Sequence, residues 1–511
     1  MRSKLIAALV ATLTATTMIT PAAGAAQQVP AKYLTQTVDW KPCFNPVPPG
    51  FPPGAEKLEC GTFTTPMNWN SPNGKDITIA VSRLKTAANP KQTILTNPGG
   101  PGGAGRTTPL IFLDRKKLTD NAEIIGIDPR GTGASSNVTC GGVDFLGAVD
   151  PRDRDPRNLD LLNDTMELQA KFCQLKSGEL GPFISTDQTV KDLDLLRQLL
   201  KRDKVSWIGY SGGTWMGAYY ATYFPKQVDK FVLDSNTEFT NDWQTIFGAF
   251  GPAFERRFRT DFLPWVAKYD NVFHLGTTAE QVRQVYETTR ARLAAEPLQL
   301  PDGTVVTATL LDFILIQAQY SKARFQQGAA DLAFIANPGQ FTATASFPDA
   351  LIGTRFGILC NDTPFRGGRE YLNRFSEQTG RKSPLMGYYM IAGPCAFWNR
   401  PNIQLKQPTG IGVPPVLMVQ SVRDPATPLE GARKAHNRFA GSRMLTVNDE
   451  GDHGIYGFGN ACVNNVVESF IVDGVTPPRD SQCPGVPLPA PGSAAKNPIV
   501  EANHLAELAG W

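Results

Sequence analysis

The chain has 511 residues, of which 41% are hydrophobic and 19% are charged, and its net charge is +3. This balance is typical of a globular protein that forms one large domain with an insertion, or two to three domains. No run of Lys and Arg is dense enough to indicate a surface for nucleic acid or for an anionic membrane, so we expect neither partner.

The first residues have the order of charged and apolar residues that is found in secretory signal peptides. Arg2 and Lys4 precede an apolar stretch at 5–18, and small residues follow at 22–26. The apolar stretch is too short for a comfortable membrane span. We therefore expect residues 1–25 to be a signal peptide, with or without a short pro-segment after it. The mature protein should be secreted, extracellular, monomeric and free of a membrane anchor.

The eight cysteines agree with export, because an even number of cysteines in a secreted chain favours disulfides. No C-x-x-C motif occurs and no Cys/His cluster has zinc spacing, so we expect no metal. One or two free buried thiols are the alternative. The cysteines fall into four local couples, and we expect sequential pairing: Cys43–Cys60, Cys140–Cys173, Cys360–Cys395 and Cys462–Cys483.

Over the first half of the chain, short apolar stretches alternate with helical patterns, which predicts a mostly parallel sheet with crossover helices. After a Pro-rich segment, alternating residues at 60–63 and 77–81 predict edge strands. Asp128 and Arg130 should pin a structural turn near the site. The remaining expected elements are buried strands at 92–96, 123–128, 205–208 and 231–234, and helices at 160–175 and 189–200.

A Gly-rich loop at 97–105 follows the strand at 92–96. It lacks the G-K-[ST] and G-x-G-x-x-G spacings of phosphate-binding loops. One interpretation is a flexible surface loop. The other is a loop whose backbone amide binds a substrate carbonyl oxygen, and in that case we expect Gly100 to be the donor, with Gly99 next.

Residues 209–213 (GYSGG) lie between the strand at 205–208 and an apolar helix that begins near Thr214. Strand, G-x-S-x-G and helix, in that order, predict a nucleophile elbow that holds Ser211 at the end of the strand. The turn is so tight that its serine adopts sparsely allowed backbone angles. The amide of Gly212 should then be the second oxyanion donor. An ordinary Gly-rich turn is the alternative.

From about 242 to 406 the strand signals thin out and helices dominate, which predicts an inserted, mostly helical cap. The expected helices span 250–269, 278–295, 308–321 and 369–379. The sheet resumes at 413–421, and we expect a helix at 429–439 and a last strand at 443–447. The expected units are thus a first core part at 26–240, the cap at 241–406, and a second core part at 407–511 with a disulfide-closed tail.

Ser211, Asp424 and His453 occur in the order serine, acid, histidine, and each follows a predicted strand. This is the chain order of the α/β-hydrolase triad, so we expect that fold and this triad. The serine needs a base to take its proton, and the acid fixes the imidazole tautomer. Asp449 and Asp452 lie too close to His453 in sequence to orient its ring easily.

The chain resembles the secreted tripeptidyl aminopeptidases of Streptomyces-like actinobacteria, which are serine peptidases related to proline iminopeptidase. The resemblance covers nearly the whole mature chain. It rests on N-P-G-G-P-G-G at 97–103, D-P-R-G-x-G at 128–133, G-Y-S-G-G at 209–213, L-D-S-N at 233–236, D-P-x-T-P at 424–428 and D-H-G at 452–454.

This resemblance implies removal of tripeptides from the free N-termini of peptides and proteins, without a cofactor. Such an enzyme needs a carboxylate at a fixed distance from Ser211 to bind the substrate amine. Glu238 and Asp362 are the two candidates, and an ordinary structural acid is the alternative for each. A secreted carboxylesterase or lipase-like hydrolase of the same fold is the nearest rival, and an inactive binding protein of that fold is a more distant one.

Overall fold

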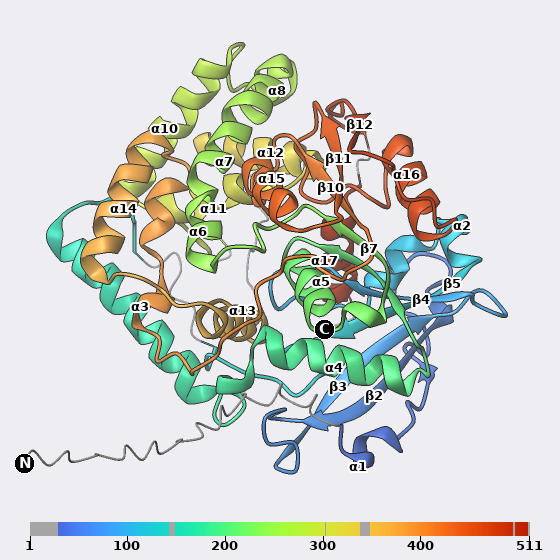
Figure 1. Cartoon of the computed structure of the whole chain (residues 1–511). Coiled ribbons are helices and arrows are strands. Elements are labelled where there is room, and N and C mark those ends of the chain that lie inside the picture. Colours follow the sequence, from blue (N-terminus) through green and yellow to red (C-terminus); the bar gives the residue numbers. More distant parts are fainter. Residues whose placement is uncertain (1–28, 143–148, 302, 338–347, 494–495, 509–511) are drawn as a thin grey trace, which may run out of the picture.

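The computed structural model describes residues 29–142, 149–301, 303–337, 348–493 and 496–508 (Figure 1). The expected signal peptide, 1–25, lies outside the described residues. Within these ranges, no helix is both long and apolar enough to cross a bilayer.

A ten-stranded sheet forms the centre of the molecule, in the order β1-β2-β3-β5-β4-β6-β7-β10-β11-β12. The first three strands pair antiparallel, and β3 also pairs antiparallel with β5. All later neighbours are parallel, which confirms the expected mostly parallel sheet and the α/β-hydrolase class. The strands are β1 (Lys41–Pro42), β2 (Leu58–Pro66), β3 (Asp76–Leu84), β4 (Gln92–Asn97), β5 (Ala122–Asp128), β6 (Val205–Tyr210), β7 (Val228–Asp234), β10 (Val416–Ser421), β11 (Arg443–Asn448) and β12 (Ser481–Pro484).

The central strands are buried on both faces, so almost every residue along them is buried rather than every second one. Successive side chains of β6 enter two different cores: Trp207 packs with α4 and α5, and Ile208 packs with α16 and α17. These covering helices are α4 (Thr186–Leu199), α5 (Gly212–Tyr223), α16 (Ala461–Ile471) and α17 (Pro498–Leu508), with α15 (Leu429–Arg438) on the α5 side.

A mostly helical segment is inserted between β7 and β10, and Figure 1 shows most of it beside the sheet, above the long α3 (Pro156–Lys176). Its helices bury a separate core rich in Phe, including Phe254, Phe258 and Phe262. We propose the expected limits 241–406 for this cap. It contains α6 (Trp243–Gly248), α7 (Phe250–Arg257), α8 (Leu263–Lys268), α9 (Asp270–Phe273), α10 (Ala279–Ala295), α11 (Ala308–Gln319), α12 (Phe325–Ala336), α13 (Asp349–Asp362), α14 (Arg369–Lys382) and the hairpin β8 (Leu298–Gln299) and β9 (Val305–Val306).

Three expectations about the elements are wrong. β2 and β3, which were expected to be edge strands, each have a neighbouring strand on both sides. The strand at 443–447 is not the last, because β12 adds to the sheet edge in parallel with β11. β12 has only four residues and ends in a proline, so its sequence is a weak indication of a strand. The expected helix at 250–269 is divided by a π-helical turn at Phe258–Phe262. In addition, the helices α12 and α13 were not predicted from the sequence.

All four expected disulfides are formed, Cys43–Cys60, Cys140–Cys173, Cys360–Cys395 and Cys462–Cys483, and no free cysteine remains. The last of them joins α16 to β12, so it fixes the short edge strand against the core. Each link restricts a loop of the unfolded chain, which typically stabilises a fold by about 2–4 kcal/mol.

Candidate active site

Ser211 lies between β6 and α5 with φ 53° and ψ −120°, a region that L-residues rarely adopt. The neighbouring glycines permit this turn. A Cβ atom on Gly209 would lie 2.3 Å from Trp207 Nε1, and one on Gly213 would lie 2.8 Å from the carbonyl oxygen of Asn97. The chain therefore has room for the turn only because these side chains are missing, as the elbow motif predicts.

His453 and Asp424 form a buried pair in the loops after β11 and β10. His453 Nδ1 lies 3.0 and 2.9 Å from the two carboxylate oxygens of Asp424. The carboxylate also accepts hydrogen bonds from the backbone amides of Ala426 and Thr427 and from the Thr427 hydroxyl. Both side chains of the pair are almost fully buried. Asp424 thus holds the ring by Nδ1 and leaves Nε2 for proton transfer.

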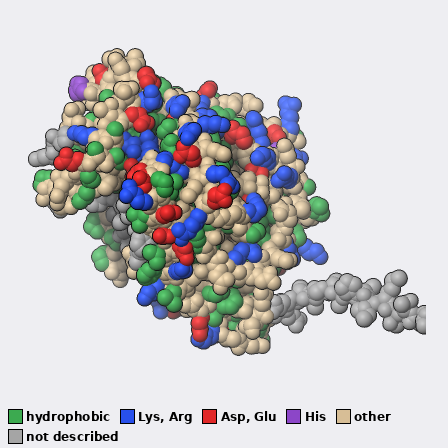
Figure 2. Space-filling model, turned by 90° about the vertical axis from the view of Figure 1, so that its left-hand side faces the viewer, with side chains coloured by type: hydrophobic (Ala, Val, Ile, Leu, Met, Phe, Trp, Pro, Cys, Tyr) green, Lys and Arg blue, Asp and Glu red, His purple; other side chains and the backbone are tan. Residues whose placement is uncertain are grey.

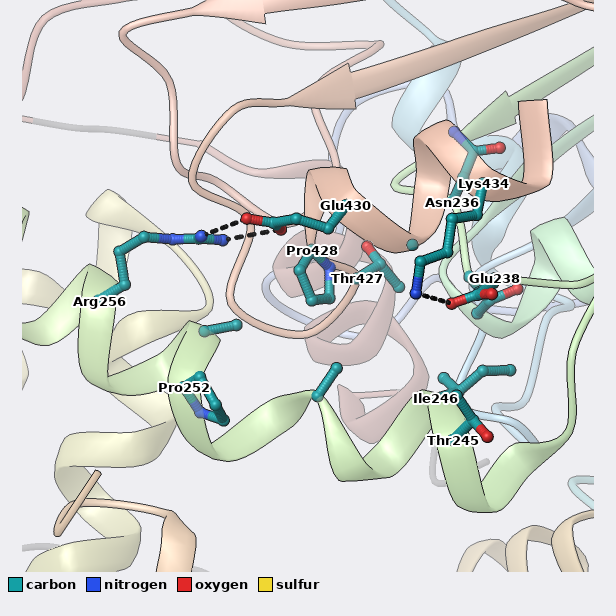
Figure 3. Close-up of a pocket in the computed structure, with 14 residues that line it drawn as sticks. Asn236, Glu238, Thr245, Ile246, Pro252, Arg256, Thr427, Pro428, Glu430 and Lys434 are labelled. Carbon is teal, nitrogen blue, oxygen red and sulfur yellow. Dashed lines mark hydrogen bonds and ion pairs between the residues drawn. The ribbon is translucent and has the colours of Figure 1, made fainter. Parts of the chain in front are cut away.

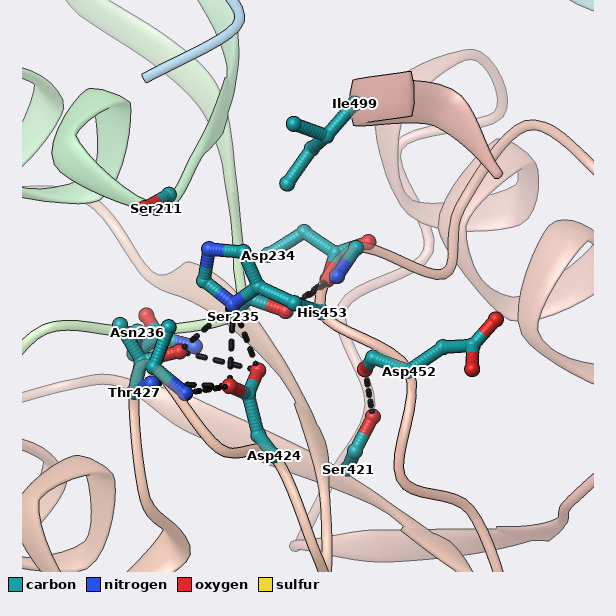
Figure 4. A network of polar contacts seen from close by, with 12 residues as sticks. Ser211, Asp234, Ser235, Asn236, Ser421, Asp424, Thr427, Asp452, His453 and Ile499 are labelled. Carbon is teal, nitrogen blue, oxygen red and sulfur yellow. Dashed lines mark hydrogen bonds and ion pairs between the residues drawn. The ribbon is translucent and has the colours of Figure 1, made fainter. Parts of the chain in front are cut away.

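Ser211 and His453 line the same cavity. Figure 4 shows the second ring nitrogen of His453 on the side of the ring that faces Ser211, away from Asp424. Among the described residues, no hydrogen bond joins the serine hydroxyl to the ring. Catalytic hydrogen bonds of this kind are often long before substrate binds, so the arrangement fits a resting serine hydrolase.

The Gly-rich loop packs directly against the elbow. A Cβ atom on Gly99 would lie 2.8 Å from Ser211 Cβ, and one on Gly212 would lie 3.1 Å from Pro101 N. The Gly99 amide donates to Asn97 Oδ1 over 2.9 Å, so it is not free to bind a substrate oxygen. Gly100 is exposed on the cavity wall, and Gly212 begins α5, where backbone amides have no partner within the helix. This geometry favours Gly100 over Gly99 as the oxyanion donor beside Gly212.

A cavity of about 890 Å³ lies beside these groups and is lined by the Gly-rich loop, the cap and the C-terminal helix. Its wall is largely aromatic and apolar. Among the described lining residues the charged side chains are arginines, and none is Asp or Glu. The wall includes Trp243, Phe247, Phe250, Phe313, Tyr320, Phe356, Phe365, Tyr371, Phe375 and Tyr389, with Arg106, Arg324 and Arg355.

Neither candidate for the amine-binding acid lines this cavity. Glu238 lines a separate cavity of about 260 Å³, where its carboxylate lies 3.4 Å from Lys434 Nζ and accepts a 2.9 Å hydrogen bond from Asn241 (Figure 3). Asp362 is fully buried at the end of α13, and its carboxylate accepts hydrogen bonds from the amide and hydroxyl of Thr186. The structure therefore brings Ser211, Asp424 and His453 together, and it places neither acid in the cavity that Ser211 and His453 line.

A group of charged and polar side chains connects the His453 loop to the cap. This group was not predicted from the sequence. The Asp452 carboxylate lies 2.7 Å from Arg257 Nη2 of α7 and accepts a hydrogen bond from Ser321. Glu450 pairs with Lys322 over 2.6 Å. The D-H-G motif includes Asp452, but a local motif does not indicate which cap residues bind its carboxylate.

Asp234, at the end of β7, holds the same loop from the core side. Its carboxylate accepts hydrogen bonds from the backbone amides of Ile455 and Tyr456. Burial raises its pKa to about 6, although these hydrogen bonds oppose the shift. The L-D-S-N motif at 233–236 includes Asp234, but the position of this residue at the end of a strand does not indicate that it binds the His453 loop.

Comparison with known proteins gives both sequence and structural relatives. A family model described as TAP-like protein matches residues 383–483. A tripeptidyl aminopeptidase of Streptomyces lividans is 32% identical over 89% of this chain and 88% of its own. The serine protease Hip1 of Mycobacterium tuberculosis is 25% identical, over 88% and 91%. A crystal structure of proline iminopeptidase from Mycobacterium smegmatis is similar with a TM-score of 0.32 and 15% identity, over 77% and 91%.

We expect Asp424→Asn to lower kcat by about 10⁴-fold, because an amide favours the wrong imidazole tautomer and cannot stabilise the imidazolium. The rate of hydrolysis of a tripeptide p-nitroanilide measures this. Asp449→Asn is the matched control, since that carboxylate is in the loop after β11 and its side chain is 97% exposed. Similar rates for the two variants would exclude Asp424 as the acid.

Asp362 should make stability depend on pH, because burial raises its pKa to about 7 in the folded chain, against about 3.9 when unfolded. Its contribution is then complete below pH 4 and is lost as the pH rises through 7. Between pH 5 and pH 8, the free energy of unfolding of Asp362→Asn should therefore rise by about 2 kcal/mol relative to that of the parent. Urea unfolding at the two pH values measures the difference. An unchanged difference between variant and parent would contradict the shift.

Proposed function

Since this chain belongs to the tripeptidyl aminopeptidase family, we propose that it releases tripeptides from the free N-termini of peptides and proteins. The observation that carries the proposal is the buried Asp424–His453 pair, whose histidine lines one cavity with a serine held in elbow geometry. The peptide is the substrate and the protein needs no cofactor for this reaction, since its own side chains supply the nucleophile and the base and its backbone amides supply the oxyanion donors.

The proposed mechanism is acyl transfer. Ser211 Oγ attacks the carbonyl carbon of the third substrate residue while His453 Nε2 takes the hydroxyl proton. The amides of Gly100 and Gly212 bind the oxyanion, and a single such donor is typically worth about 3 kcal/mol. His453 then protonates the leaving amine, which departs with the rest of the chain. Water, activated by the same ring, hydrolyses the tripeptidyl ester and restores the serine.

The size of the cavity supports an exopeptidase. Its volume of about 890 Å³ falls in the range of pockets that hold small ligands, about 300–1,000 Å³. A space of this size accommodates a tripeptide at the end of a chain. The positions of Glu238 and Asp362 do not support either as the amine-binding acid, so we assign that role to neither.

A carboxylesterase is the second candidate. The specific observation in its favour is that no Asp or Glu is found among the described residues that line the cavity. An ester with an uncharged acyl group needs no carboxylate to bind it, whereas a substrate ammonium ion usually does.

We further propose that the protein acts outside the cell as a monomer without a membrane anchor. Four disulfides support an oxidising compartment. On the face that Figure 2 shows, basic and acidic side chains are interspersed with apolar ones rather than gathered into a patch of one charge. That pattern is typical of a solvated surface.

The deciding experiment compares Ala-Ala-Pro-p-nitroanilide with its N-acetylated form, with Ser211→Ala as the blank. We expect cleavage of the free form only, because the enzyme must bind the substrate amine. Equal cleavage of both forms would indicate an endopeptidase or a permissive hydrolase. Failure to cleave either, with hydrolysis of p-nitrophenyl esters retained, would establish the carboxylesterase.

A further inference from the structure

The C-terminal helix α17 forms part of the catalytic cavity. Ile499, Val500 and Ala506 line the cavity together with Ser211 and His453, so residues almost 300 positions apart share one wall. The same helix packs on the segment that follows the Gly-rich loop, where the Thr107 hydroxyl donates to the carbonyl oxygen of Ala502. One element thus contacts both the histidine side and the oxyanion side of the site.

Asn497, just before α17, makes four hydrogen bonds with one side-chain amide. Its Nδ2 donates to the carbonyl oxygens of His453 and Gly454, each over 2.9 Å. Its Oδ1 accepts from the amides of Ile499 and Val500 at the start of the helix, over 3.0 and 3.1 Å. The residue is 2% exposed, so these contacts are shielded from water. Asn497 therefore caps α17 and holds the histidine loop at the same time.

The carbonyl groups of His453 and Gly454 matter because other elements hold only the amide groups of these two residues. The His453 amide donates to the carbonyl oxygen of Tyr320 in the cap, and the Gly454 amide donates to Ser235 Oγ in the core. Among the described side chains, Asn497 alone is hydrogen bonded to the carbonyl oxygens of His453 and Gly454. Gly454 has φ +87°, and a Cβ atom there would lie 2.9 Å from Ile499. The loop and α17 are therefore in close contact.

We propose that Asn497 is a positioning residue for His453 and that the docking of α17 completes the catalytic site. This inference rests on the proposed function only in taking His453 as the base. The Asn497 amide fixes the carbonyl groups of the two consecutive peptide units that follow the histidine Cα, and so fixes where the ring meets Ser211. Displacement of a catalytic group by about 1 Å can cost about 100-fold in rate.

Asn497→Asp separates the two roles of the side chain. Aspartate still accepts from the helix amides, since it is as good a helix cap as asparagine, but it has no N–H to donate to the loop carbonyls. Asn460→Asp is the matched control. Asn460 also caps a helix, α16, through its Oδ1, and its Nδ2 donates to the carbonyl oxygen of Pro484, away from the site.

The test measures kcat and KM for each variant with p-nitrophenyl acetate and with the free tripeptide p-nitroanilide, together with the melting temperature. For Asn497→Asp we expect kcat to fall by about 10–100-fold with KM within about twofold, and the pH profile of kcat to shift. For Asn460→Asp we expect a lower melting temperature and an unchanged kcat. If Asn497→Asp does not fold, Asn497→Ser, which caps the helix but is too short to reach the carbonyls, replaces it.

An unchanged kcat in the folded Asn497 variant, or the same loss of kcat in both variants, would overturn the inference. The ester separates this outcome from failure of the proposed function. If the parent hydrolyses the ester but not the peptide, the peptidase proposal fails. A selective loss of ester hydrolysis in Asn497→Asp would still establish the positioning role.

Discussion

The loop that carries His453 is held in place by hydrogen bonds from separate parts of the chain. The core supplies Asp234 and Ser235, and the cap supplies the carbonyl oxygen of Tyr320 and the Arg257 side chain. The C-terminal segment supplies Asn497. Because a serine hydrolase needs its imidazole within hydrogen-bonding reach of the nucleophile, the position of this one loop decides whether the site functions.

Several of these contacts involve buried charges, which are costly unless they are paired. Asp452 is fully buried and is compensated by Arg257, which in turn pairs with Asp261 within α7 and the π-turn. Removing one member of such a group leaves an uncompensated charge, and that typically costs about 3–5 kcal/mol. The cap is therefore connected to the catalytic loop electrostatically as well as by packing.

The sequence predicted those parts of the site that depend on local patterns. The elbow at Ser211 needs glycines at fixed offsets, and Asp424 and His453 each follow a strand, so their meeting at one sheet edge follows from the parallel topology. The four disulfides join neighbours in the chain and could be predicted for the same reason.

The remaining parts depend on the direction of a side chain or on contacts distant in sequence. Glu238 follows a sheet strand as expected, but it faces Lys434 on α15 rather than the catalytic cavity. Asp362 points to the start of α4, where Thr186 binds it. The role of α17 could not be predicted, because its sequence pattern indicates a helix without indicating what that helix covers. The edge strand β12 is too short and too polar to be recognised without its partner β11.

The most direct test of the central claim is to follow the products from an unblocked peptide of about twenty residues by mass spectrometry over time. We expect successive loss of tripeptides from the N-terminus, so that the remaining chain shortens in steps of three residues. Loss of single residues, or fragments produced by internal cleavage, would contradict it.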